Sequence, residues 1–196
     1  MSGLGFADPV FESQAAFRAI LAAMARPGAI LPCGGGLEPP APLSPAAAAA
    51  ILALADFETP LWIAPSFWAN REIPDYLKFH SGAPLAAAPD RAAFALIDGA
   101  SDALRLTDFA RGTAEYPDRS TTVVLQLRSL SQGARLALAG PGVRGPTALA
   151  AGPLPDDFVA QWAANQAGFP LGVDCILAAF AEVAALPRSV RVTGES

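Results

Sequence analysis

The sequence predicts an α/β domain of three layers with a mixed sheet, spanning residues 1–196 as a single unit. Helix-type apolar spacing alternates along the chain with short apolar segments that fit strands. Two neighbouring strand candidates are placed so that they can pair antiparallel, which would make the sheet mixed. A length of 196 residues with 53% hydrophobic and 16% charged residues fits one compact domain and excludes disorder over most of it.

The N-terminal part is expected to begin with a helix over Val10–Ala25. Four apolar residues at helical spacing predict its buried stripe: Phe17, Ile20, Leu21 and Met24. Arg26-Pro27-Gly28 ends this helix, because proline cannot continue it. A short strand is expected at Ala29–Pro32, followed by a loop over Cys33–Pro45 that holds three glycines and four prolines.

The middle of the chain is predicted to continue the alternation of helices and strands. Ser44-Pro45 favours the start of a helix, with serine as the N-cap residue and proline in the first turn. The small side chains of Ala46–Ala55 predict that this helix is closely packed and buried. The elements expected next are a strand at Pro60–Ala64, a helix at Asn70–Phe79, a strand at Phe94–Ile97 and a short helix at Ala103–Ala110.

The C-terminal half contains the clearest strand, Thr121–Arg128, which begins with β-branched residues. The turn-rich segment Ser129–Gly133 follows it and leads to a strand at Arg135–Ala139, so we expect these two strands to form an antiparallel hairpin. The remaining expected elements are a helix at Asp156–Gln166 and strands at Asp174–Ala179 and Ser189–Val192. The alanine-rich stretch after Ala179 fits either a helix or a strand.

Composition argues against several classes of function. The net charge of −5 and the scattered arginines disfavour nucleic-acid binding, which needs a basic stripe. The apolar run Ala46–Ala55 is too short to span a membrane, and the N-terminal residues lack the basic region of a secretory signal. Cys33 and Cys175 are interpreted as buried free thiols in a reducing cytoplasm. Residues 1–8 and 193–196 are expected to be flexible.

The chain contains one histidine, His80, and one lysine, Lys78. A zinc site with two or three histidines is therefore impossible within one chain, and no Cys-x-x-Cys pair replaces it. A hydrolytic triad would need His80 as its base, and a Schiff base would need Lys78. These counts restrict the chemistry open to an autonomous enzyme.

Two glycine-rich segments fit phosphate-binding patterns only in part. Gly140–Gly145 matches G-x-G-x-x-G after a strand, but Pro141 and Pro146 fit poorly with a helix beginning there, so we interpret it as a turn. Gly34–Gly36 lacks the lysine and hydroxyl residue of a P-loop and is interpreted as a flexible loop.

Polar residues elsewhere have spacings suited to chemistry. Asp56 and Glu58 would share one face of an extended segment, where two carboxylates can bind a metal or divide acid and base roles; the other interpretation is a solvated helix end. Four arginines are each able to grip a carboxylate or phosphate through two parallel bonds: Arg18, Arg111, Arg119 and Arg188. Residue chemistry alone leaves the ligand or partner unknown.

Seven short motifs, taken in order, resemble a known family. They are FRAILAAMARPG (Phe17–Gly28), LADFETPLW (Leu54–Trp62), KFHSGAPL (Lys78–Leu85), GTAEYPDRST (Gly112–Thr121), GPGV (Gly140–Val143), FPLGVD (Phe169–Asp174) and LPR (Leu186–Arg188). Together they are similar to the H-subunit family of the bacterial carbon–phosphorus lyase system, over about residues 6–192. The glycine-rich Cys33–Pro42 segment departs from the family pattern.

The resemblance implies a role in the use of phosphonates as a phosphorus source. It implies a cytoplasmic homodimer that joins G, I, J and K partner subunits. With the G, I and L components it would support attack of a phosphonate on the ribose of ATP, giving α-D-ribose 1-methylphosphonate 5-triphosphate. It also implies a shortened pyridoxal-phosphate-dependent transferase fold that has lost its cofactor, so we expect no cofactor and no metal.

The matched motifs contain eight polar residues that we take as candidates for one cleft or interface, with ATP or a phosphonate as the candidate ligand: Arg18, Asp56, Glu58, His80, Thr113, Thr121, Asp174 and Arg188. Packing or docking of other subunits is their alternative role, and no catalytic residue is assigned. Two other functions stay open, namely an independent small-molecule transferase that uses Lys78 or His80, and a pure scaffold subunit.

Overall fold

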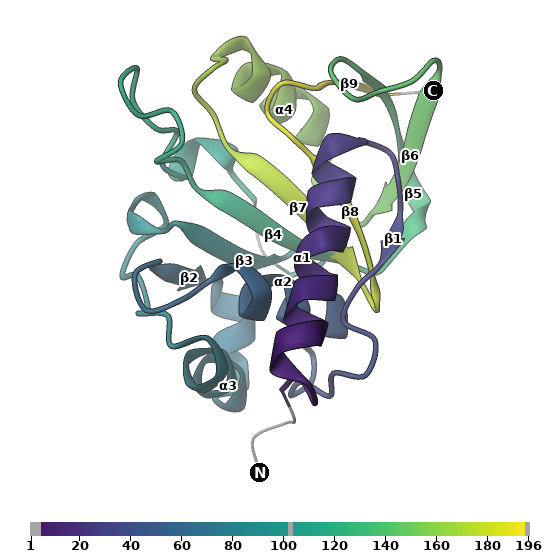
Figure 1. Cartoon of the computed structure of the whole chain (residues 1–196). Coiled ribbons are helices and arrows are strands. Elements are labelled where there is room, and N and C mark those ends of the chain that lie inside the picture. The colour runs from purple at the N-terminus through teal and green to yellow at the C-terminus, as the bar shows by residue number, and fades with distance from the viewer. Residues whose placement is uncertain (1–4, 102–103, 195–196) are drawn as a thin grey trace.

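The computed structural model describes residues 5–101 and 104–194, which form helices and two sheets (Figure 1). The α-helices are α1 (Pro9–Ala25), α2 (Pro45–Leu54), α3 (Glu72–Ser81) and α4 (Phe158–Ala167). The 3₁₀ helices are η1 (Pro65–Ala69), η2 (Pro89–Arg91) and η3 (Leu106–Asp108). The strands are β1 (Leu31–Pro32), β2 (Leu61–Ile63), β3 (Phe94–Asp98), β4 (Thr122–Leu127), β5 (Ser129–Ala139), β6 (Thr147–Gly152), β7 (Asp174–Ala179), β8 (Glu182–Leu186) and β9 (Arg191–Gly194).

The larger sheet has six strands in the order β1-β8-β7-β4-β3-β2. Its strands β2, β3, β4 and β7 are parallel, whereas β8 is antiparallel to β7 and β1 is antiparallel to β8. The smaller sheet is antiparallel throughout, in the order β6-β5-β9. The chain is therefore an α/β protein with a mixed sheet, as the sequence predicts.

The two faces of the larger sheet bury different sets of side chains, because successive residues of a strand point to opposite faces. Val124 and Ile176 lie in a core cluster with residues of α1, α2 and α3. Their chain neighbours Val123 and Cys175 lie in a second cluster with residues of α4 and the smaller sheet. This arrangement is compatible with the three layers predicted, with α1 in front of the larger sheet in the view of Figure 1.

Two helices begin with a side-chain cap, of which the one at Ser44 was predicted from the sequence and the one at Asp8 was not. The Asp8 carboxylate accepts hydrogen bonds from the backbone N–H groups of Val10 and Phe11, which satisfies two donors at the start of α1. The Ser44 hydroxyl accepts the N–H of Ala47 at the start of α2. The alanine face of α2 is buried throughout Ala46–Ile51, as its small side chains indicate.

The predicted buried stripe of α1 is partly wrong. Phe17 and Leu21 are 46% and 56% exposed, whereas the buried residues of the helix are Ala16, Ile20 and Ala23. The small side chains of Ala16 and Ala23 let α1 approach α2 and β8 closely. The larger residues at positions 17 and 21 lie toward solvent. The helical spacing of apolar residues was therefore predicted correctly, whereas the face of the helix that is buried was not.

The predicted hairpin between Thr121–Arg128 and Arg135–Ala139 is wrong. After β4 the chain passes directly into β5, which pairs with β6 and β9 in the smaller sheet and not with β4. The segment expected to be a turn, Ser129–Gly133, is the start of β5, where the register with β6 shifts. Gly133 has a φ of +115°, and a Cβ there would lie 2.5 Å from the carbonyl oxygen of Ala151, so a close backbone approach requires glycine.

Three further differences concern single elements. β6 was not predicted, because its sequence TALAAG has one β-branched residue, Thr147, and no aromatic residue. The alanine-rich stretch after Ala179 forms strand β8. The short helix expected at Ala103–Ala110 begins outside the described residues, and its described part contains only the single turn η3.

The chain ends were expected to be flexible over residues 1–8 and 193–196, and residues 1–4 and 195–196 lie outside the description. Within it, Asp8 caps α1 and β9 extends through Gly194. Among the helices described, none has the length and hydropathy needed to cross a bilayer.

Candidate functional site

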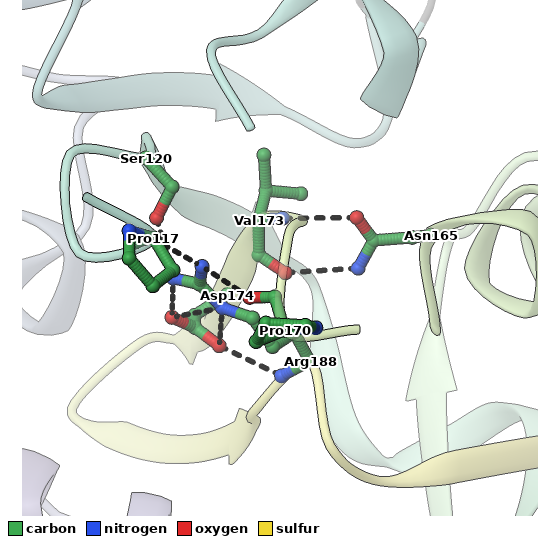
Figure 2. A network of polar contacts seen from close by, with 7 residues as sticks. All are labelled: Pro117, Ser120, Asn165, Pro170, Val173, Asp174 and Arg188. Atoms are coloured by element: carbon green, nitrogen blue, oxygen red, sulfur yellow. Dashed lines mark hydrogen bonds and ion pairs between the residues drawn. The ribbon is translucent and has the colours of Figure 1, made fainter. Parts of the chain in front are cut away.

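An ion pair joins Asp174, the first residue of β7, to Arg188, the second residue after the end of β8. Asp174 and Arg188 lie together because β7 and β8 are antiparallel, with Cys175 paired to Leu186. The Arg188 Nη2 atom is 2.5 Å from Asp174 Oδ2, and its Nε atom is 3.2 Å from both carboxylate oxygens. The Arg188 backbone N–H also donates to Asp174 Oδ1 at 2.7 Å. The pair is therefore held through both side chain and backbone (Figure 2).

The rest of the Arg188 guanidinium is committed to other segments. Its Nη1 atom donates to the carbonyl oxygens of Pro117 at 2.8 Å and Pro170 at 3.4 Å, and Nη2 also donates to the Ser120 hydroxyl. The side chains of Arg188 and Asp174 are only 14% and 21% exposed. Each nitrogen of this guanidinium thus has a protein partner, which makes Arg188 a clamp between segments rather than an open anion site.

Figure 2 shows that this clamp brings together three motifs that are far apart in sequence: Gly112–Thr121, Phe169–Asp174 and Leu186–Arg188. Asn165 of α4 extends the network, because its amide donates to the Val173 carbonyl and accepts the Val173 N–H, both at 2.9 Å. Sequence reasoning missed Asn165. It follows Phe158 and Trp162 at helical spacing on the buried face of α4, and a polar residue on such a face is a usable signal.

The clamped loop 112–121 has hydrogen bonds of its own at its tip. Thr113 and Tyr116 exchange backbone hydrogen bonds at 3.1 Å, and the Thr113 hydroxyl also accepts the Tyr116 N–H. The Arg119 guanidinium stacks 4.0 Å from the centre of the Tyr116 ring, which is 49% exposed. Thr121, in contrast, is fully buried and donates to the carbonyl of Ala92 at 2.6 Å, so its hydroxyl is structural.

Asp56 and Glu58 lie in a tight turn before β2 and do not face each other as an extended carboxylate pair. The Asp56 carboxylate accepts the Glu58 N–H at 2.9 Å and the Thr59 hydroxyl at 3.1 Å. The Thr59 hydroxyl in turn accepts the Asp56 N–H at 2.7 Å. The segment is exposed, and this geometry fits a self-contained Asx turn.

The remaining candidates lie apart from the clamp. His80 is partly buried in α3, where its ring is 4.6 Å from that of Tyr76 and 5.0 Å from that of Phe79. Lys78 is exposed in the last turn of the same helix. Arg18 is exposed on α1. Burial raises the pKa of Tyr76 to about 12, so its phenol stays protonated at neutral pH.

Two groups of candidates lie at the end of the larger sheet where its parallel strands begin. Asp174 and Thr121 lie where β7 and β4 begin, and Asp56 lies just before β2 begins. Because β2 is three strands from β7, these groups are separated by about 14 Å at ~4.8 Å per strand. The structure brings Thr121, Asp174 and Arg188 together, with Thr113 in the attached loop, and places the other four elsewhere.

The opposite edge, where the parallel strands end, is the usual ligand position in open α/β sheets. Here Gln126 near the end of β4 accepts the Ser44 N–H at 2.8 Å and donates to the Pro42 carbonyl at 3.0 Å. The loop that includes the glycine-rich 33–42 segment is thereby fixed to this edge. None of the eight polar candidates from the sequence motifs lies at this end of the strands.

Both cysteines are free and buried, as the sequence predicts. Burial raises the pKa of the Cys33 thiol to about 11. Burial, with a smaller contribution from the nearby Asp174 carboxylate, raises the pKa of Cys175 well above its ordinary value. Both thiols are protonated at neutral pH and are poor nucleophiles.

The residues present do not fit a pyridoxal phosphate site or a metal centre. Lys78, the one lysine, lies on α3, whereas both oxygens of the Asp174 carboxylate are engaged by Arg188 and are not available to a pyridine nitrogen. Among residues 5–101 and 104–194, no three His, Cys, Asp or Glu side chains form a group suited to a metal ion. The arrangement can position a loop and a strand end; it provides no nucleophile next to a base.

Comparison with known proteins gives a consistent result. A family model described as "Bacterial phosphonate metabolism protein (PhnH)" matches residues 4–193. A protein of Rhizobium meliloti (strain 1021) named "Alpha-D-ribose 1-methylphosphonate 5-triphosphate synthase subunit PhnH" is 40% identical over 190 residues, which cover 97% of this chain and 94% of that protein. The "Putative C-P lyase subunit protein HtxG" of Stutzerimonas stutzeri is 36% identical over 81 residues, covering 41% of this chain and 42% of that protein.

The match extends across all seven motifs, including the three that the Arg188 clamp joins, so the resemblance inferred from the motifs is confirmed. The chain belongs to the bacterial phosphonate metabolism protein (PhnH) family.

Proposed function

We propose that this chain is a non-autonomous subunit of a carbon–phosphorus lyase system for phosphonate catabolism. In this role it supports formation of α-D-ribose 1-methylphosphonate 5-triphosphate from ATP and methylphosphonate. The observation that carries the proposal is the 40% identity to a named synthase subunit over 97% of the chain. Near-complete coverage of both proteins means that the whole domain is shared, not a common fragment.

The geometry of the Arg188 clamp supports a subunit role over autonomous catalysis. Its charged pair is used to hold the loop 112–121 against β7, and the exposed ring of Tyr116 lies at the tip of that loop. A fixed loop that ends in an exposed aromatic residue suits contact with another protein chain, since tyrosine is favoured at interfaces. We therefore propose that G, I and J subunits are its partners.

The same proposal extends to the location, oligomeric state, fold and ligand of the chain. The chain works in the cytoplasm, as a homodimer when it is separated from its partners. Its fold is a shortened form of the pyridoxal-phosphate-dependent transferase fold, a proposal that rests on the family resemblance and with which the mixed sheet is compatible. It works without that cofactor, and ATP or a phosphonate is its ligand within the complex.

Co-expression of the tagged chain with G, I and J subunits tests the proposal. We expect the subunits to co-purify, and we expect methylphosphonate-dependent release of adenine from ATP only with the partners present. Adenine release by the chain alone, abolished in Lys78→Ala or His80→Ala, would instead support an independent transferase. An absorbance band near 400 nm that borohydride and Lys78→Ala both remove would show that a cofactor is bound after all.

A further inference from the structure

A hollow of about 320 Å³ lies where the end of α1 meets the turn between β5 and β6. Its lining comes from two segments more than a hundred residues apart, Arg26–Ala29 and the turn that contains Gly142, Arg144 and Thr147. These segments belong to the ARPG and GPGVRG stretches of the sequence, and neither takes part in the Arg188 clamp. The hollow is therefore a second place where separate motifs meet.

Two glycines allow the walls of this hollow to approach. Gly142 has a φ of +79°, and a Cβ there would lie 2.4 Å from the Ala25 carbonyl oxygen. Gly28 has a φ of +93°, and a Cβ there would lie 2.4 Å from the Thr147 side chain. Side chains at either position would push the two segments apart, so the hollow is a fixed feature of the fold.

The hollow carries positive charge that the protein does not use internally. Arg26 and Arg144 both line it and both are exposed. Neither side chain makes a hydrogen bond or ion pair with any of the residues described, and the lining contains no aspartate or glutamate. In a chain with a net charge of −5, two such guanidiniums beside one hollow form a local exception to the overall charge.

The end of α1 opposes an anion here only weakly. A helix C-terminus acts as about half a negative charge, and the Arg26 backbone N–H already bonds the carbonyls of Ala22 and Ala23. The two full positive charges of Arg26 and Arg144 exceed this partial negative charge. The Thr147 hydroxyl bonds the Arg144 carbonyl at 3.2 Å, which keeps the turn that carries Arg144 closed.

We propose that the hollow between Arg26 and Arg144 binds the phosphate chain of a polyphosphate ligand, a triphosphate being the chemical class that fits best. The planar guanidinium presents paired donors that match phosphate oxygens, and two of them can hold successive phosphates of one chain. The choice of a triphosphate over a single phosphate rests on the proposed function, in which ATP is consumed and a ribose 5-triphosphate is formed.

Isothermal titration of the full chain with inorganic tripolyphosphate tests the site. We expect Arg26→Gln/Arg144→Gln to weaken binding at least tenfold, because both donors of the hollow are removed. The matched control is Arg91→Gln/Arg128→Gln, which removes the same charge from two exposed arginines elsewhere and should bind within twofold of the wild type. Arg26→Lys/Arg144→Lys should be intermediate, because lysine keeps the charge but not the paired donors.

Parallel titrations with inorganic phosphate, methylphosphonate and ATP separate possible sources of the anion. We expect tripolyphosphate and ATP to bind alike and the two monomeric anions to bind more weakly. Equal binding by the wild type and the glutamine variant, or an equal loss in the control, would overturn the site. Urea unfolding of each variant shows whether it is folded. A folded lysine variant that binds as tightly as the wild type would count against guanidinium recognition, because positive charge alone would then be enough.

Failure of this inference is distinguishable from failure of the proposed function. If the glutamine variant still co-purifies with G, I and J subunits but binds tripolyphosphate as tightly as the wild type, only the site is wrong. If the wild type binds tripolyphosphate through these arginines but never joins the partners, the proposed function is wrong and the site stands.

Discussion

Arginine has opposite roles at the two motif junctions of this protein. At the start of β7, every nitrogen of the Arg188 guanidinium has a protein partner, and the side chain is 14% exposed. At the end of α1, Arg26 and Arg144 are exposed and have no partner among the residues described. The difference follows from Asp174, because this partly buried carboxylate occupies the Arg188 donors. Arg26 and Arg144 have no such carboxylate beside them in the described part of the chain.

Residues in equally recognisable motifs thus fall into two kinds: those whose polar groups hold the fold together, and those whose polar groups remain available to a ligand. Arg188 belongs to one of the seven motifs and joins it to two others, and its guanidinium is fully used in these structural contacts. Arg26 lies in another of them, yet it was not among the candidates from the sequence. Motif membership alone therefore does not identify a binding residue, and the hydrogen-bond donors that a side chain leaves unused are a better basis for proposing one.

The largest expected effect comes from removing the clamp. We expect Arg188→Ala to lower the free energy of unfolding by about 3 kcal/mol, because the partly buried Asp174 carboxylate and the Pro117 carbonyl lose their partners. Arg26→Ala should change it by less than about 0.5 kcal/mol, as is usual for an exposed side chain without partners.

Urea unfolding followed by circular dichroism gives both values under one condition. The contrast between the two regions fails if the two alanine variants lose similar stability. Arg188→Lys provides a further check, since lysine keeps the charge opposite Asp174 but cannot reach Pro117 and Ser120 at once, and it should recover only part of the loss.

A smaller effect is expected at Asn165, which extends the clamp to α4. Asn165→Ala leaves the N–H and carbonyl of Val173 unpaired in a buried position, at a cost of about 2 kcal/mol. Val173 is adjacent to Asp174, so the double variant with Arg188→Ala should lose less than the sum of the two single losses.

A double-mutant cycle measured by the same urea unfolding tests that coupling. Strict additivity would mean that the clamp is two separate contacts and not one network. Asp56→Ala, made in an exposed turn three strands away, serves as the control and should be additive with Arg188→Ala.

The two regions also show what the sequence can and cannot predict. Ser44-Pro45 predicted the start of α2, and the apolar period of α1 predicted a helix, because both signals are local. The partner of Arg188 was not predictable, since Asp174 is fourteen residues away and becomes a neighbour only when β7 and β8 pair. The wrong hairpin has the same origin, because β5 leaves the sheet of β4 through contacts with β6 and β9 that no local pattern specifies.

The smallest expected effect concerns the charges of the hollow themselves. Two guanidiniums that share a hollow with no carboxylate repel each other, so Arg144→Gln should raise the free energy of unfolding by a few tenths of a kcal/mol at low ionic strength, relative to Arg128→Gln. The gain should vanish in about 1 M NaCl, where the screening length falls to roughly 3 Å. Urea unfolding in phosphate-free buffer at the two salt concentrations measures it, and Arg128→Gln accounts for the general effect of one positive charge lost from an acidic protein. If Arg144→Gln instead loses more stability than Arg128→Gln, then Arg144 already interacts favourably with the protein. The two junctions would then be alike, and the hollow would have one free guanidinium instead of two.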